Sequence, residues 1–154
     1  MQRVTNCLLV DGKKSLLLQK PSKGWWVAPG GKMESGESIK ESVQREFREE
    51  TGLLLKDVQL RAVLSVVVKD KENIVSEWMM FTFKATRFEG FQLEQSPEGT
   101  LEWKNNEDIL SLPMAEGDTY LFRHLLEGDG LMYGTVHYTP DFKLLSYRFD
   151  PVPE

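Results

Sequence analysis

The fold is decided by residues 31–53, which read GKMESGESIKESVQREFREETGL. We expect the first part, 31–37, to be a loop, because it follows a Pro-Gly pair and carries two glycines itself. The second part, 38–51, has apolar side chains at helical spacing between charged ones, which predicts an amphipathic helix. Ser38, with Glu41 three residues later, has the capping-box pattern that begins a helix.

Glutamates crowd the inward side of this predicted helix. On a helical wheel Glu46 and Glu50 fall within or beside the apolar stripe that contains Phe47, and Glu49 lies near its edge. Like charges three and four residues apart repel, and carboxylates that turn inward lose hydration. Arg45 neutralises only part of this charge, so we expect a hard divalent cation, Mg²⁺ or Mn²⁺, to supply the rest. A charged surface helix with ion pairs between its turns is the structural alternative.

The spacing of the charged residues and glycines is more specific than the helix itself. It resembles the Nudix box of the nucleoside-diphosphate-linked hydrolases, G-x5-E-x7-R-E-U-x-E-E-x-G-U, in which U is aliphatic. Phe47 takes the first aliphatic position, which faces the core and needs bulk. The flanks also resemble the family, with strands before the box and an acidic-Gly-x-x-x-Trp element, residues 98–103, after it. Every fixed letter of the box is present: Gly31, Glu37, Arg45, Glu46, Glu49, Glu50 and Gly52.

The resemblance implies hydrolysis of a phosphoanhydride bond, a reaction that depends on positioning and charge neutralisation. It implies that Glu49 and Glu50 are metal ligands together with the backbone carbonyl of Gly30. It also implies that Glu46 is a further ligand or the base. Two residues are expected to orient this acidic cluster, as groups behind metal ligands do: Arg45 and Glu37.

Members of the family often use another acid, from a distal loop, as ligand or base. Glu98, in the run Pro97-Glu98-Gly99, matches that position best, and Glu102 is the second choice. A glutamate in a loop is usually only solvated, so the structural alternative stays open here.

The sequence is less specific about the residues that would bind the rest of the substrate. Trp25 and Trp26 alternate in direction along a predicted strand, so we expect one to face the core and the other the cleft. The carboxylates of Glu116 and Asp118 suit a purine edge, although Asp118 also stands where it would cap a helix. Three lysines flank the cleft and are candidates for steering phosphates, against the default that lysines are solvated: Lys20, Lys23 and Lys32.

Strand-like runs lie on both sides of the predicted helix. They favour a three-layer α/β/α sandwich with a mixed sheet, which is also the Nudix fold, in a single domain over 1–154. A loop is expected over 85–100, a helical turn over 105–110 and a second helix over 118–126. Strands are expected over 3–10, 15–19, 25–28, 58–69, 74–84, 101–104, 131–138 and 142–149.

The composition limits the classes of function. The chain has 154 residues, enough for one domain with its own core. A net charge of −5 argues against a nucleic-acid-binding surface, whereas a bound metal would still attract a phosphate substrate. No apolar run has the length of a membrane span or a signal peptide, and a single cysteine, Cys7, suits a reducing cytosol. We therefore expect a cytoplasmic monomer or homodimer without a nucleic-acid duplex or membrane as partner.

Sequence outside the box points to a guanine nucleotide. The region just past the box, 66–70, lacks the proline of ADP-ribose hydrolases and the tyrosine of diadenosine polyphosphate hydrolases. Other segments look like the MutT-like nucleoside triphosphatases of Gram-positive bacteria, which are associated with removal of 8-oxo-dGTP. Guanosine alarmones such as pppGpp are an alternative substrate, and a non-catalytic nucleotide sensor is an alternative function. The segments that carry this likeness are 3–6, 24–32 and 134–138.

Overall fold

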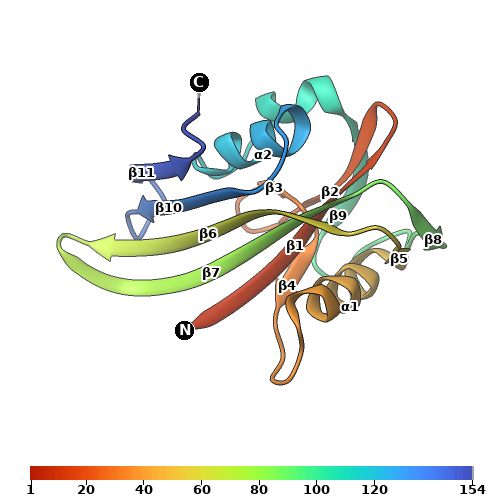
Figure 1. Cartoon of the computed structure of the whole chain (residues 1–154), viewed down its shortest axis with the longest axis horizontal. Coiled ribbons are helices and arrows are strands. Elements are labelled where there is room, and N and C mark those ends of the chain that lie inside the picture. The colour runs from red at the N-terminus through yellow and green to blue at the C-terminus, as the bar shows by residue number, and fades with distance from the viewer. Residues whose placement is uncertain (154) are drawn as a thin grey trace.

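A mixed β-sheet separates two helices in the computed structural model, which describes residues 1–153 (Figure 1). The elements in chain order are β1 (Gln2–Asp11), β2 (Lys14–Gln19), β3 (Trp26–Val27), β4 (Gly30–Lys32), α1 (Ile39–Thr51), β5 (Leu53–Leu55), β6 (Gln59–Asp70), β7 (Asn73–Ala85), β8 (Phe88–Gly90), β9 (Thr100–Asn105), the 3₁₀ helix η1 (Asn106–Ser111), α2 (Asp118–Glu127), β10 (Met132–Tyr138) and β11 (Leu144–Asp150). The main sheet has the order β11-β10-β6-β7-β1-β2-β3, with β4 beside β1 and β9 beside β2. Two pairs are parallel, β1 with β7 and β10 with β6, which confirms the predicted mixed sheet.

Helix α1 begins and ends where the sequence predicts. Ser38 is the N-cap, its side chain accepts from the backbone N–H of Glu41, and the Glu41 side chain accepts from the N–H of Ser38 in return. Gly52 ends the helix at φ +83°, in the left-handed conformation that glycine adopts at little cost. Val43 and Phe47 are fully buried beneath the sheet. The capping box, the glycine stop and the apolar stripe are therefore confirmed.

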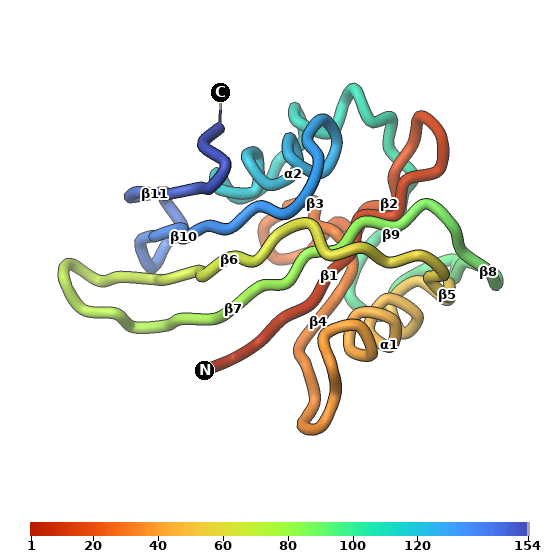
Figure 2. The backbone as a smooth tube through the Cα atoms, viewed as in Figure 1, coloured from red at the N-terminus to blue at the C-terminus, as the bar shows by residue number. Residues whose placement is uncertain are grey.

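Two apolar layers lie on opposite faces of the sheet. Along β1 the side chains alternate, so that Leu8 packs on the α2 side while Cys7 and Leu9 pack on the α1 side. Burial raises the pKa of the Cys7 thiol well above its ordinary value, as expected for a small core residue. Figure 2 traces the long β6–β7 hairpin, which reaches well beyond the part of the sheet that α1 covers.

Three short strands differ from the prediction. β4 lies partly in the stretch expected to be a loop, where it pairs with β1. β5 follows α1 directly and pairs with β8, which lies inside the loop expected over 85–100. Each is only a few residues long, so its sequence shows no readable period, and its hydrogen-bond partners come from elsewhere in the chain.

Helix α2 covers the other face of the sheet. Its N-cap is Gly117, and no side chain caps its first turn, so the prediction that Asp118 is the cap is wrong. The sequence predicts Tyr120, Leu121 and Leu125 as the buried face of this helix. Leu121 and Leu125 are buried, but the third buried residue is Phe122, and Tyr120 is only partly buried. Within residues 1–153 no helix is both long enough and apolar enough to cross a membrane.

Candidate functional site

Glu50 is a buried carboxylate at the inner side of α1. Its residue is 5% exposed, and the backbone N–H of Gly30 donates to its Oε2 at 3.0 Å. Burial raises its pKa to about 7; the charges of Glu46 and Glu98 act in the same direction, whereas the Gly30 N–H and the charge of Lys20 oppose them. No ion pair to Glu50 forms among residues 1–153. This position therefore favours a cation that the described side chains do not themselves provide.

Arg45 and Glu37 form the strongest charged pair of the site. The Arg45 Nε donates to Glu37 Oε2 at 2.6 Å and its Nη2 donates to Glu37 Oε1 at 2.9 Å, so the pair is bidentate. The hydrogen bonds from Arg45 lower the pKa of Glu37 to about 2, and the same contact raises the pKa of Arg45. Nη2 also donates to the carbonyl of Lys32 at 3.1 Å, which joins the helix to the end of β4.

The remaining nitrogen of Arg45 holds two more glutamates. Its Nη1 donates to Glu46 Oε1 at 2.8 Å and lies 3.3 Å from Glu49 Oε2. Glu46 has a side chain that is 17% exposed, whereas that of Glu49 is 59% exposed, so Glu49 lies on the outer rim. The prediction that Glu50 and Glu46 turn inward is confirmed. The expectation that Glu49 is a third inward carboxylate is wrong, because its place on the helix lies farther round from the apolar stripe.

The two adjacent glycines serve contacts within the protein. A Cβ at Gly30 would collide with the backbone of β1 at Thr5, and a Cβ at Gly31 would collide with the carboxylate of Glu46. The sequence predicts that these glycines let the backbone approach a ligand; in the structure they let β4 approach β1 and α1. A buried hydrogen bond of 2.8 Å between the hydroxyls of Thr5 and Ser42 fixes α1 against β1 at the same level.

The expected metal ligands lie together at this level, although they do not form a closed cage. No group of three acidic, His or Cys side chains in residues 1–153 converges closely enough to hold a metal, and Arg45 contacts both Glu46 and Glu49. The donors on offer are carboxylate and backbone oxygens, which suit hard divalent cations. The residues therefore fit such an ion by their chemistry, centred on Glu50, which forms no ion pair within residues 1–153.

The two candidate distal acids behave differently. Glu98 is exposed on the loop before β9, and its negative charge acts on Glu50. Glu102 lies within β9, where its carboxylate pairs with the Lys104 ammonium at 3.5 Å. The structure therefore brings Glu98, and not Glu102, into electrostatic contact with the buried carboxylate.

The three candidate lysines also differ in their position relative to Glu50. Lys20 is the one whose charge acts on Glu50. Lys23 instead lies over the Trp25 ring, with its Nζ 4.8 Å from the ring centroid. Lys32 is exposed at the end of β4, where its backbone carbonyl accepts from Arg45. Of the three candidates, Lys20 is therefore the one whose charge reaches the buried carboxylate.

A cavity of about 190 Å³ lies on the α2 face of the sheet. Trp25 lines it, whereas Trp26 is 5% exposed in the core, with Lys104 Nζ 4.2 Å from its ring centroid. Asp118 also lines the cavity, and burial raises its pKa to about 6, but Glu116 is exposed and does not line it. The other lining residues are Leu64, Val66, Trp78, Met80, Ala115, Gly117, Val136, Tyr138 and Phe142, none of which the sequence marks as functional.

This cavity adjoins the carboxylate cluster through β1. The Asn6 side chain donates from Nδ2 to the sulfur of Met80, which lines the cavity, at 3.6 Å. In the ladder between β1 and β4, Asn6 is the partner of Gly30, whose N–H binds Glu50. Asn6 of β1 therefore lies between the cavity and the buried carboxylate of Glu50.

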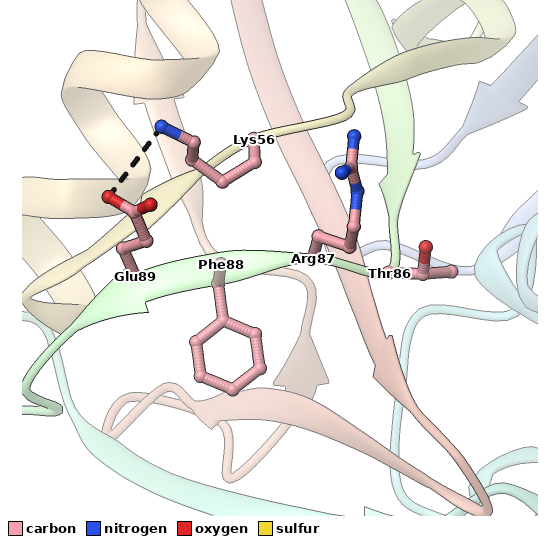
Figure 3. Close-up of a pocket in the computed structure, with 5 residues that line it drawn as sticks. All are labelled: Lys56, Thr86, Arg87, Phe88 and Glu89. Atoms are coloured by element: carbon pink, nitrogen blue, oxygen red, sulfur yellow. Dashed lines mark ion pairs between the residues drawn. The ribbon is translucent and has the colours of Figure 1, made fainter.

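A second hollow, of about 390 Å³, lies at the β5–β8 pair (Figure 3). Lys56, Thr86, Arg87, Phe88 and Glu89 line it, and the Lys56 ammonium pairs with the Glu89 carboxylate at 3.6 Å. No residue predicted for the site lines this hollow, so the two groups of functional candidates are the carboxylate cluster and the cavity beside Asn6.

Comparison with known proteins agrees with this arrangement. The family model for the NUDIX domain matches residues 1–125. The Nudix hydrolase YvcI of Bacillus subtilis (strain 168) is 56% identical over 151 residues, which cover 98% of this chain and 96% of that protein. The crystal structure of a mutator MutT protein from Bacillus halodurans superposes with a TM-score of 0.97 at 62% identity, covering 99% of this chain and 100% of the other. The 8-oxo-dGDP phosphatase NUDT18 of Mus musculus is 39% identical over 67 residues, which are 44% of this chain and 18% of that protein.

The chain therefore belongs to the Nudix family: it is a hydrolase that acts on derivatives of nucleoside diphosphates, and its family uses divalent metal cations.

Proposed function

We propose that this enzyme hydrolyses a phosphoanhydride bond of a nucleoside polyphosphate in a Mg²⁺-dependent reaction, with a guanine nucleotide such as 8-oxo-dGTP as substrate. The observation that carries the proposal is the buried Glu50, which forms no ion pair within residues 1–153 and lies one strand position from a base-sized cavity. We further propose that 1–154 act as one domain, because β10 and β11, which follow residue 125, extend the same sheet.

The proposed metal ligands are Glu46, Glu49, Glu50 and the carbonyl of Gly30, with Mg²⁺ or Mn²⁺ as the ion. When bound, such an ion polarises phosphoryl oxygens and lowers the pKa of a bound water. Arg45 keeps the carboxylate of Glu46 in place beside α1 and is itself held by the bidentate contact with Glu37. The chain thus contributes negative charge in a fixed position and little covalent chemistry, as phosphoryl transfer requires.

We expect Mg²⁺ or Mn²⁺ at millimolar concentration to raise the melting temperature. The reason is linkage: an ion that binds the folded carboxylates and not the unfolded chain stabilises the fold. Thermal melts in EDTA and in Mg²⁺ measure the shift, and Glu50→Gln should reduce it. NaCl at three times the concentration of MgCl₂ has the same ionic strength and is the control. Equal melting temperatures in EDTA and Mg²⁺ would count against the site.

We propose Glu98 as the distal base, since its charge acts on Glu50 from an exposed loop. Glu98→Gln should lower kcat by about 100-fold with little change in KM, the range that general bases contribute. Glu102→Gln is the matched control, because it removes the same charge from the neighbouring strand. If kcat falls only in the control, the role belongs to Glu102; if it falls in neither, Glu46 becomes the candidate.

The base is proposed to bind in the cavity of about 190 Å³. Ordinary ligand pockets measure roughly 300–1,000 Å³. This smaller cavity therefore suits the base alone, and the phosphates of the nucleotide would lie towards Glu50. Trp25 offers an aromatic face to stack on a base. Asp118, ionised above a pH of about 6, offers acceptors for the N1 and N2 protons of guanine, which adenine does not present in that pattern.

Side-by-side kcat/KM values for 8-oxo-dGTP, dGTP, pppGpp, ATP and ADP-ribose test the choice of substrate. We expect a guanine nucleotide to lead, and Asp118→Asn to reduce its preference over ATP by about 100-fold, because a site built on hydrogen bonds discriminates strongly. Glu116→Gln is the control, since Glu116 is exposed and does not line the cavity. A higher kcat/KM for ATP or ADP-ribose than for any guanine nucleotide would refute the guanine assignment but would still be consistent with a Nudix hydrolase.

A further inference from the structure

The β10–β11 hairpin contributes to the cavity from outside the part of the chain that matches the NUDIX domain, residues 1–125. Val136 and Tyr138 come from β10, and Phe142 comes from the turn that follows it. β10 reaches the cavity because it pairs in parallel with β6, whose Leu64 and Val66 form the neighbouring wall. The base-sized cavity is therefore completed by a segment that the general family pattern does not specify.

Phe142 has a backbone conformation that is unusual for a bulky residue. Its φ is +61°, in the left-handed region that favours glycine, asparagine and aspartate. The turn holds it there: the Phe142 N–H donates to the carbonyl of Thr139 at 2.9 Å, and the Thr139 N–H donates to the carbonyl of Lys143 at 2.9 Å. The N–H of Lys143 donates in turn to the Thr139 hydroxyl at 2.9 Å. Strained residues of this kind cluster at ligand-binding sites, where the surrounding structure fixes them.

The strained turn directs the Phe142 ring towards Trp25. The two rings meet edge to face, with centroids 6.1 Å apart and planes at 88°, and the Tyr138 ring lies 5.6 Å from Phe142 on the other side. Lys23 Nζ lies 5.1 Å from the Phe142 centroid and 4.8 Å from that of Trp25, so one cation bridges both rings. We call Trp25, Tyr138 and Phe142 the aromatic wall.

The aromatic wall is tied to the loop that carries Asp118. The Gly117 N–H donates to the Tyr138 hydroxyl at 2.8 Å, and a Cβ at Gly117 would collide with that hydroxyl and with Val136. Asp118 follows directly and begins α2. The hairpin therefore fixes the distance between an aromatic surface and a carboxylate, which are the two features that recognise a purine ring and its edge.

We propose that Phe142 is a specificity-determining residue of this enzyme, whose ring completes the surface that selects a purine base. The inference rests on the proposed hydrolysis of a nucleoside polyphosphate. Phe142 acts on the base and does not touch the phosphates, which belong to the carboxylate cluster on the other side of Asn6. Removing its ring should therefore weaken the binding of nucleotides and leave the chemical step intact.

Three variants test this role. Phe142→Asn removes the ring and keeps a residue that tolerates positive φ, so the turn is preserved. Phe142→Tyr keeps the aromatic face. Leu145→Ala is the control, because Leu145 is 53% exposed on the same hairpin and does not line the cavity. For each variant we would measure kcat and KM for dGTP, ATP, dCTP and dTTP, and inhibition by inorganic triphosphate, which lacks a base.

We expect Phe142→Asn to raise KM for the purine nucleotides by about 10- to 100-fold, the loss that follows from one stacking contact. Its kcat should stay within about threefold, since uniform binding is what is lost. The preference for purines over pyrimidines should shrink, and inhibition by inorganic triphosphate should not change. Phe142→Tyr and Leu145→Ala should match the wild type in all of these measurements.

Two outcomes would overturn the proposal. One is an unchanged KM and base preference in Phe142→Asn, and the other is an equal weakening of inorganic triphosphate, which would mean that Phe142 acts through the fold. If the wild type hydrolyses no nucleoside polyphosphate, the proposed function fails instead. In that case the binding of dGTP and of inorganic triphosphate would be measured by quenching of tryptophan fluorescence in the wild type and in the same three variants. Weaker binding of dGTP alone in Phe142→Asn would support the role of Phe142.

Discussion

Glu50→Gln should lower kcat by about 1,000-fold and leave the fold intact. Glutamine keeps the shape of the side chain and an oxygen for the Gly30 N–H, which lies 3.0 Å from Oε2. It removes the one carboxylate of the cluster that is both buried and without an ion pair in residues 1–153. Charge stabilisation by a bound metal is worth several kcal/mol, and each 1.36 kcal/mol is a factor of ten in rate. Steady-state kinetics in saturating Mg²⁺ measure the loss.

The same variant has a stability signature in metal-free buffer. The pKa of Glu50 is raised from 4.5 to about 7, so the fold disfavours its ionised form. The associated stability is present below pH 4.5 and is lost as the pH rises through about 7. Wild-type protein in EDTA should therefore be about 1–3 kcal/mol less stable at pH 8 than at pH 5 through this group. Glu50→Gln should not show this part of the pH dependence in urea titrations.

Glu41→Gln is the matched control for both measurements. It neutralises a glutamate of the same helix, and glutamine also completes a capping box. Its kcat should stay close to that of the wild type. If Glu41→Gln and Glu50→Gln lose activity to the same extent, the effect belongs to the charge of the helix as a whole and not to the buried position.

Arg45→Lys should lower kcat/KM by about 10- to 100-fold although the charge is kept, the range found when a group behind a metal ligand is changed. The Arg45 guanidinium holds Glu37 with two nitrogens, Glu46 with a third and the carbonyl of Lys32 as well. A lysine ammonium is a single point charge and cannot make these contacts together. The affinity for Mg²⁺, measured by titration of activity, should weaken by a similar factor because Glu46 is no longer held.

Arg61→Lys provides the control for this substitution. Arg61 also binds two acceptors, Asp129 at 2.8 Å and Gln59 at 3.0 Å, but it lies on β6, which β7 and β1 separate from β4, and it contacts no residue of the carboxylate cluster. It should retain full activity and metal affinity. Full activity in Arg45→Lys would mean that the charge alone is needed and that the fixed geometry around Glu46 is not.

The sequence was most informative where the structure depends on neighbours along the chain. The bounds of α1, its caps and the inward position of Glu50 all follow from residue spacing, because the regular turn of a helix sets the direction in which each side chain points. The partners of Arg45 were predicted only in part. Glu41 lies four residues before Arg45 but is engaged in the capping box, and Glu37 from the preceding loop pairs with Arg45 instead.

The remaining errors concern contacts between distant segments. Alternation along a strand predicts that one of Trp25 and Trp26 faces the cleft, but the register of β3 against β2 decides which one. β4 and β8 exist because β1 and β5 offer them backbone partners. Phe142 carries no local signal, because its place in the cavity wall depends on the parallel pairing of β10 with β6.

The parallel pairing of β10 with β6 also implies an order of assembly during synthesis. Gly30 and Glu50 are 20 residues apart, and Arg45 and Glu37 only 8, so the carboxylate cluster requires short loop closures. The aromatic wall instead joins Trp25 to a turn after β10, and long-range parallel pairings form slowly. Because the chain leaves the ribosome N-terminus first, we expect the carboxylate cluster to form before the aromatic wall. The selectivity proposed for the aromatic wall would then be the last property that the growing chain acquires.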